Sequence, residues 1–180
     1  MADVDEVTKD PHKAYTLYVG MPYNDAVANF KHLSGWQFYE EWKYFAFFSV
    51  KEDNNKLVKE CVCVEFDPNE ESIFSWSIYF LTDNFNIADN IYKRICKRLE
   101  ENPELSFGQE YKFTDKNPNY TEIEKVWYLR SNNTPIETGK IEVSIQSSPY
   151  RDYGYGMFLL QTLPVKAKYA VSIDRFRSFR

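Results

Sequence analysis

The spacing of apolar residues changes along this 180-residue chain, and that change limits the possible folds more than any other feature. Ile87, Ile91, Ile95 and Leu99 recur at every fourth position, which is the spacing of one apolar helix face. The segments before and after this helix instead place apolar residues at every second position, as strands with one buried face do. Separate segments with these two periods predict an α+β domain.

The sequence predicts two principal helices. The first lies between Asn24, a suitable N-cap, and Gly35, a suitable left-handed stop. The second begins at a cap formed by Asp83 or Asn84 and ends at Asn102, which precedes a proline. Both helices carry an apolar face that must be covered by another layer of the fold.

Strands are expected in the segments that have the two-residue period. These segments are 15–19, 42–50, 57–66, 74–80, 110–113, 123–129, 141–145, 156–163 and 169–173. Short polar turns join many of them, so consecutive strands should pair as antiparallel meanders with both helices packed on the sheet. The order of helix, meander, helix and meander also favours a tandem pseudo-repeat of helix-then-sheet halves, although no residue-level self-similarity supports a duplication.

The expected domain organisation follows from these elements. Residues 1–13 are acidic and without a sustained period, which predicts a flexible, solvated N-terminal arm. Residues 14–174 form a single α+β domain, with possible halves at 15–81 and 82–174. Residues 175–180 carry arginines and phenylalanines in alternation and form a basic-aromatic tail.

Charge and composition exclude several classes of function. The 22 Lys and Arg against 27 Asp and Glu leave a net charge of −5, which argues against general nucleic-acid binding. No apolar run reaches the roughly 20 residues that a membrane helix needs, and the first residues do not resemble a signal peptide. We therefore expect a cytoplasmic protein, or an exported one if a leader has been removed.

The residue types that most often carry catalysis or metal binding are few and scattered. Cys61 and Cys63 alternate onto one strand face and are interpreted as buried packing residues; with three cysteines in the chain, a disulfide framework is not expected. His12 and His32 lie far from any matching nucleophile or metal-ligand spacing. Phosphate-binding glycine motifs are absent. The sequence therefore predicts no metal, no cofactor and no assigned catalytic residue.

One pair of carboxylates has the spacing for acid–base chemistry. Glu122 and Glu124 lie two residues apart on an expected strand and therefore on one face of the sheet. We favour a solvated surface for this pair because one face of an antiparallel sheet is commonly exposed to water. An enzyme that acts through such carboxylates, or through Tyr and Arg, remains an alternative, which a pocket lined by Glu122, Glu124 or Arg130 would support.

The start of the domain carries a resemblance to known proteins. The segment Tyr18-Val19-Gly20-Met21-Pro22, a short helix and a meander resemble small bacterial α+β proteins. The element order over residues 15–174 is also similar to the tandem helix-plus-sheet units of β-lactamase-inhibitor-type proteins and the related outer-membrane assembly lipoproteins. The resemblance implies a protein-binding module rather than an enzyme. Since no lipoprotein cysteine lies near Met1, it does not carry membrane attachment over to this chain.

An aromatic loop is the sequence's candidate for the binding surface. Tyr150, Arg151, Tyr153 and Tyr155 lie in a segment rich in Ser, Gly and Tyr, a composition typical of binding loops. We therefore predict non-catalytic recognition of a protein partner, of the inhibitor, immunity or assembly-factor type, through these four residues. A structural or oligomerisation domain is a further alternative. The sequence identifies neither the partner nor the number of subunits.

Overall fold

A computed structural model of the chain describes residues 4–31, 36–42, 45–51, 57–67, 69–115, 120–129, 139–147 and 167–177. The helices are α1 (Val4–Thr8), α2 (Tyr23–Lys31) and α3 (Phe85–Glu100). The strands are β1 (Lys13–Ala14), β2 (Leu17–Tyr18), β3 (Trp36–Trp42), β4 (Phe45–Lys51), β5 (Lys59–Asp67), β6 (Ser72–Thr82), β7 (Leu105–Asp115), β8 (Tyr120–Leu129), β9 (Gly139–Ser147) and β10 (Tyr169–Arg177).

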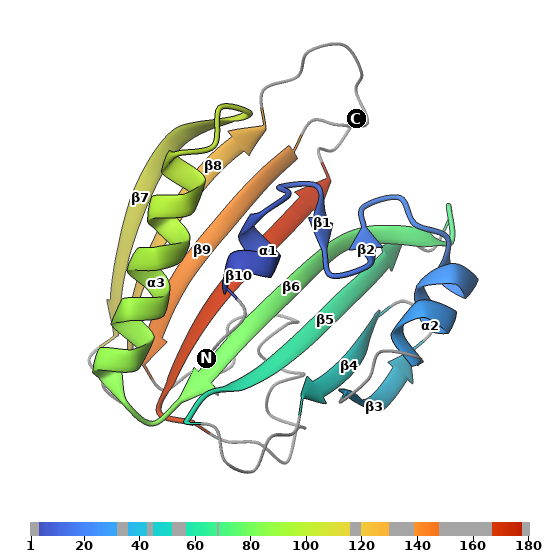
Figure 1. Cartoon of the computed structure of the whole chain (residues 1–180), viewed down its shortest axis with the longest axis horizontal. Helices are drawn as coiled ribbons and strands as arrows, with labels where there is room; N and C mark the ends of the chain where they lie inside the picture. The colour runs from blue at the N-terminus through green and yellow to red at the C-terminus, as the bar shows by residue number, and fades with distance from the viewer. Residues whose placement is uncertain are drawn as a thin grey trace.

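The described strands form one large antiparallel sheet and a two-stranded hairpin of β1 and β2 (Figure 1). The large sheet has eight strands in the order β3-β4-β5-β6-β10-β9-β8-β7. Helix α3 packs against β6, β7, β9 and β10, and α2 packs against β3 and β6. The predicted α+β class, with antiparallel meanders and two principal helices on the sheet, is confirmed.

The same element order occurs twice along the chain. Helix α2 is followed by the meander β3 to β6, and helix α3 is followed by the meander β7 to β10. The two meanders join through their last strands, because β10 pairs antiparallel with β6 from Tyr169, opposite Thr82, to Phe176, opposite Ser75. The central strands of the sheet therefore come from the ends of the two meanders.

Helix α3 forms where its apolar spacing predicts it. The side chain of Asn84 caps the helix by accepting hydrogen bonds from the backbone N–H of Asn86 at 2.9 Å and of Ile87 at 3.3 Å. The helix ends at Glu100, and its buried face is formed by Ala88, Ile91, Tyr92, Ile95, Cys96 and Leu99. This face contacts the odd-numbered side chains of β9 and β10, which together build the core.

Two predicted elements are divided differently in the structure. The strand expected over 42–50 is two strands, since β3 ends at Trp42 and β4 begins at Phe45 and pairs back along it. The strand expected over 15–19 is instead a small hairpin, in which Tyr15 adopts a left-handed φ of 56° between β1 and β2. In both places the two-residue period continues across a reversal of the chain, so periodicity alone does not reveal the turn.

The solvated arm predicted for residues 1–13 is wrong for the part that the structure describes. Residues 4–8 form α1, and the side chains of Val4 and Val7 are each 1% exposed. Helix α1 packs against α3, and Asp5 pairs with Arg94 and Arg98 of that helix. Two valines three residues apart make one apolar turn, which is too short to stand out as a period in the sequence.

The basic-aromatic tail is also corrected, because β10 continues to Arg177. Arg175 is only 2% exposed and faces Trp76 of β6 and Ile141 of β9 in the register of the sheet. Its Nη1 atom donates to the carbonyl of Phe176, and its Nε atom finds no partner among the residues that the structure describes. Burial lowers the pKa of Arg175 to about 10.

This buried arginine leads to a stability prediction. Within the described chain no carboxylate pairs with Arg175, so its burial opposes folding. We expect Arg175→Met to raise the free energy of unfolding by about 1 kcal/mol and the melting temperature by about 2–4 °C. Arg177→Met, which removes the ion pair with Glu70, should give no increase. A melting temperature of Arg175→Met below that of the wild type would contradict this assignment.

Candidate protein-binding face

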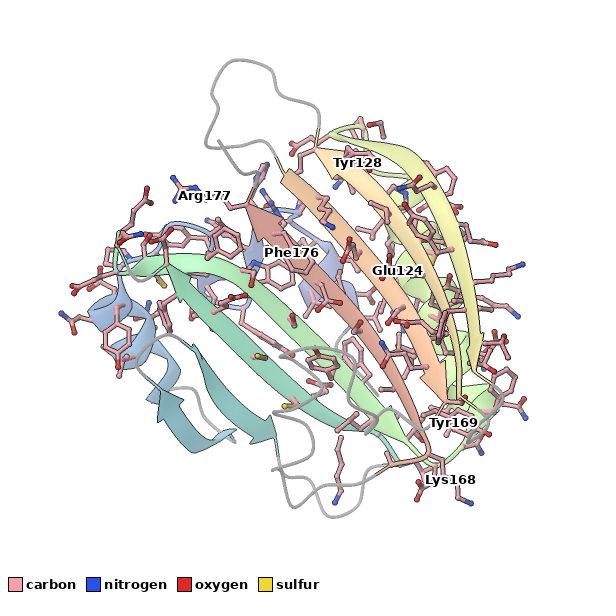
Figure 2. The ribbon with its side chains drawn as sticks, turned by 180° about the vertical axis from the view of Figure 1, so that it is seen from behind. Glu124, Tyr128, Lys168, Tyr169, Phe176 and Arg177 are labelled. Atoms are coloured by element: carbon pink, nitrogen blue, oxygen red, sulfur yellow. The ribbon has the colours of Figure 1, made fainter. Side chains whose placement is uncertain are left out.

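Polar and charged side chains make up most of the sheet face that points away from α3. Odd-numbered residues of β9 and β10 pack with α3 in the core, so alternation places the even-numbered residues on the opposite face. Figure 2 views the molecule from this side, with the strands in front of the helices and Glu124 and Phe176 labelled. We call this surface of β8 to β10 the polar face. It consists of Glu122, Glu124, Val126, Tyr128, Lys140, Glu142, Ser144, Gln146, Ala170, Ser172, Asp174 and Phe176.

A continuous chain of hydrogen bonds crosses the polar face. Gln146 Nε2 donates to Glu122 Oε1 at 2.7 Å and to Ser144 Oγ at 3.0 Å. The hydroxyls of Ser144 and Ser172 are 2.9 Å apart, and Ser172 Oγ donates to Asp174 Oδ2 at 2.7 Å. With Ser144 as the donor to Ser172, the links from Gln146 through Ser144 and Ser172 point towards Asp174, while the other N–H of Gln146 points to Glu122. The network joins three neighbouring strands and fixes the two end carboxylates relative to each other.

The acidity of Glu124 is strongly perturbed. Burial and the nearby carboxylates of Glu142, Glu122 and Asp174 raise the pKa of Glu124 to about 7, against an opposing effect of Lys140. In the register of the sheet Glu124 lies directly opposite Ser144. At neutral pH this side chain therefore exchanges a proton readily, which is the property of a general acid or base and of a pH-sensitive contact.

The pKa of Asp174, on β10, is raised as well. Burial raises the pKa of Asp174 to about 6, and the hydrogen bonds from Ser77 and Ser172 offset only part of this effect. Glu142 and Glu122 raise it further through repulsion between like charges. The polar face is therefore crowded with carboxylates that do not all carry a charge at once near pH 6.

Lys140 is the one cation among the polar-face residues defined above. Its Nζ atom is hydrogen-bonded to Glu142 Oε1, and the pKa of Lys140 is raised by this contact and by Glu124 despite its partial burial. The same ammonium lies 5.1 Å from the centre of the Phe176 ring. Lys140 neutralises one of the four carboxylates of the face, and a net acidic surface remains.

Exposed aromatic side chains border the acidic residues. Tyr128 of β8 is 44% exposed, and Tyr111 and Phe113 of β7 are 49% and 48% exposed. Tyr111 lies opposite Glu124 and Phe113 lies opposite Glu122, so these rings share the face with the carboxylates. Large aromatic side chains are enriched on the surfaces through which proteins bind each other. We call Tyr111, Phe113 and Tyr128 the aromatic border.

The three cysteines are buried. Cys61, Cys63 and Cys96 are all free and buried, and burial raises the pKa of Cys96 to about 11. Cys61 and Cys63 lie on the face of β5 opposite the core valines, as their alternation predicts. Among the described residues, no group of three or more His, Cys, Asp or Glu side chains is placed to hold a metal ion.

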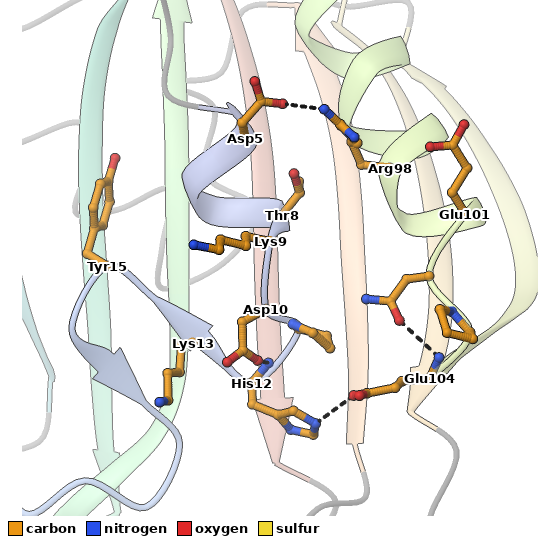
Figure 3. A pocket seen from close by; sticks show the side chains of 13 residues that line it. Asp5, Thr8, Lys9, Asp10, His12, Lys13, Tyr15, Arg98, Glu101 and Glu104 are labelled. Atoms are coloured by element: carbon orange, nitrogen blue, oxygen red, sulfur yellow. Dashed lines mark hydrogen bonds and ion pairs between the residues drawn. The ribbon is translucent and has the colours of Figure 1, made fainter.

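A cleft of about 1050 Å³ lies on the other side of the molecule, between the N-terminal segment and the end of α3 (Figure 3). Two contacts bridge its walls: an ion pair of Asp5 with Arg98 at 3.1 Å, and a hydrogen bond between His12 Nε2 and Glu104 Oε2 at 3.1 Å. Helix α1 forms part of one wall and packs against α3, so these contacts contribute to the docking of α1. His12 thus takes part in a contact between these two segments.

The structure describes some of the site residues predicted from the sequence, and others lie outside the described residues. Glu122 and Glu124 share one face, as their spacing predicts, but both are partly buried and they meet Glu142 and Asp174 from two further strands. No spacing signal in the sequence could reveal this, because the three strands are brought together only by the sheet. Tyr150, Arg151, Tyr153 and Tyr155 lie outside the described residues, as do Arg130, His32 and the strand expected over 156–163.

Comparison with protein-family models, with curated proteins and with solved structures finds no match for this chain. Among the helices that the structure describes, none combines the length and the apolar character needed to cross a membrane.

Proposed function

We propose that this protein is a non-catalytic protein-recognition module of the inhibitor, immunity or assembly-factor type. Its described binding surface would be the part of the polar face over β7 and β8, next to the aromatic border. The observation that carries this proposal is the position of two exposed aromatic rings, Tyr111 and Phe113, directly opposite the partly buried carboxylates of Glu124 and Glu122 on the side of the sheet away from α3. The predicted loop residues Tyr150, Arg151, Tyr153 and Tyr155 remain part of the proposal as a second contact.

The charge of the face indicates the chemistry of the partner. On β8 to β10 the face carries four carboxylates against one lysine. A partner that offers Lys or Arg side chains around an apolar centre would neutralise the repulsion between Glu122, Glu124 and Glu142. Nucleic acid does not fit this surface, because its phosphates would meet carboxylates. We expect a basic protein surface, met in the cytoplasm.

Capture from a lysate of the source organism tests this proposal. The tagged wild-type chain is compared with the double variant Glu122→Lys, Glu124→Lys and with a control, Glu101→Lys, Glu104→Lys, which makes the same change of net charge beside α3. Glu104 and Glu101 are more than half exposed, and they lie in the cleft rather than on the polar face. We expect a basic protein that the wild type and the control retain and that the face variant loses.

Thermal melting of all three proteins shows whether each variant is folded. A partner retained equally by the wild type and by the face variant would overturn the assignment of this face. Loss of the partner from the control alone would place the contact at the cleft. Lysate capture with Tyr150, Tyr153 and Tyr155 changed to alanine tests the loop separately.

A second candidate function is favoured by the raised pKa values of Glu124 and Asp174. Carboxyls whose pKa values lie closer to neutrality, about 7 for Glu124 and about 6 for Asp174, have the acidity that a general acid or general base of hydrolysis needs. Glu124→Gln distinguishes the two functions. A recognition module should retain most of its partner affinity with this isosteric change, whereas an enzyme should lose at least about 100-fold in turnover.

A further inference from the structure

The strand β7 forms one edge of the large sheet. In the part of the chain that the structure describes, β7 pairs with β8 on one side and is the last strand in the sheet order. It is 11 residues long, from Leu105 to Asp115. The backbone N–H and C=O groups on the outer side of such a strand have no partner in the sheet, and they can form a new ladder with another strand.

Features that normally prevent edge pairing are weak in the second half of β7. The register shift between Phe107 and Gln109 distorts only the beginning of the strand. Lys112 is the kind of charge that blocks an approaching strand, but it lies 3.2 Å from Glu110, two residues earlier on the same face. The centre of the edge therefore carries one positive and one negative charge around Tyr111, which is half exposed.

We propose that β7 pairs antiparallel with β7 of a second copy of this chain, about a two-fold axis at Tyr111. In this register Glu110 lies opposite Lys112 of the second copy, and Lys112 lies opposite Glu110. Both pairs lie on one face of the extended sheet, because residues 110 and 112 have the same parity. Tyr111 then lies opposite its own copy on the other face, as a cross-strand aromatic pair.

The charges select this register from its neighbours. A two-fold axis normal to the sheet requires paired residues to lie on the same face, so the axis must pass through a residue. An axis at Glu110 would place two glutamates opposite each other, and an axis at Lys112 would place two lysines opposite each other. Of these three axes, only the one at Tyr111 places opposite charges across from each other, and it does so twice. This charge complementarity favours a second copy over an unrelated strand.

The pairing would continue the eight-stranded sheet into a sheet twice as wide, with both copies' polar faces on the same side. Phe113 would then lie opposite Gln109 of the second copy, and the two aromatic borders would meet at the axis. The inference is independent of the proposed recognition function, since it concerns the purified chain alone. The sequence left a structural or oligomerisation domain as an alternative, and the proposed pairing of β7 describes one geometry for such a domain.

Sedimentation equilibrium of the purified full chain tests the pairing with four proteins: wild type, Glu110→Lys, Lys112→Glu and the double swap Glu110→Lys, Lys112→Glu. At about 100 µM protein, a loading concentration suited to weak dimers, we expect the wild type to be a dimer. Each single variant places like charges opposite each other twice and should weaken dimerisation at least about tenfold. The double swap restores opposite charges and should restore the dimer.

The control is Lys93→Glu on α3, which makes the same charge change as Lys112→Glu at a similarly exposed lysine. It should dimerise as the wild type does. A monomeric wild type, or single variants that dimerise as well as the wild type, would overturn the proposal. A double swap that remains monomeric while its circular dichroism matches the wild type would also overturn it. These outcomes do not depend on any lysate partner, so they are separate from failure of the proposed function.

Discussion

Replacing Phe80 with alanine is expected to lower the free energy of unfolding by about 3–5 kcal/mol. Phe80 is fully buried on β6, the strand through which the two meanders join, and lies opposite Val171 of β10 and Glu60 of β5. Removal of the ring leaves a cavity in the layer between the sheet and the helices. A loss of this size is a large part of the total stability of a typical domain, about 5–15 kcal/mol.

Urea unfolding measures this effect, and Phe85→Ala is the matched control. Phe85 is the first residue of α3 and is half exposed, with its ring 5.5 Å from that of Tyr169. The control should lose less than about 1.5 kcal/mol. Similar losses in both variants would contradict the burial of Phe80 in the core.

The second large effect is a dependence of stability on pH that originates at Glu124 and Asp174. Folding raises the pKa of Glu124 from 4.5 to about 7, so the folded chain holds a proton that the unfolded chain releases. The contribution of Glu124 to the free energy of unfolding is therefore complete below about pH 4.5, and it is lost as the pH rises through 7. Because Glu124 is only half-buried, we expect it to contribute about 1–2 kcal/mol rather than the full value of the shift.

Asp174 acts in the same direction in a lower window. Its contribution is complete below about pH 3.8 and is lost as the pH rises through 6. Urea unfolding from pH 4 to pH 8 should show that Glu124→Gln loses the upper part of the fall in stability and Asp174→Asn the lower part. If the difference in the free energy of unfolding between the wild type and Glu124→Gln did not change with pH, the crowding of carboxylates on the polar face would be contradicted.

Local features of the fold were predictable from the sequence because their causes are local. The apolar stripe and the Asn84 cap determine α3, and the short turns determine which strands are neighbours within each meander. The pairing of β6 with β10 has no such signal. It joins segments about ninety residues apart, such as Phe80 and Val171, through backbone groups that are the same in every strand.

The same distinction applies to the candidate site. Alternation places Glu122 and Glu124 on one face, because their relation lies within a single strand. Their perturbed acidity depends on Glu142 and Asp174, which arrive from β9 and β10 only when the sheet forms. The burial of Val4 and of Arg175 likewise depends on distant elements, so composition alone misassigned both ends of the chain.

The most direct test of the central claim is carboxyl footprinting, in which carbodiimide coupling of an amine to Glu and Asp side chains is read by mass spectrometry. The purified chain is labelled alone and again in a lysate of its source. We expect Glu122 and Glu124 to be labelled less in the lysate, while Glu101 and Glu104 beside the cleft are labelled equally in both samples. Protection at Glu101 and Glu104 alone, or equal labelling at all four residues, would contradict the assignment of the polar face as the binding surface.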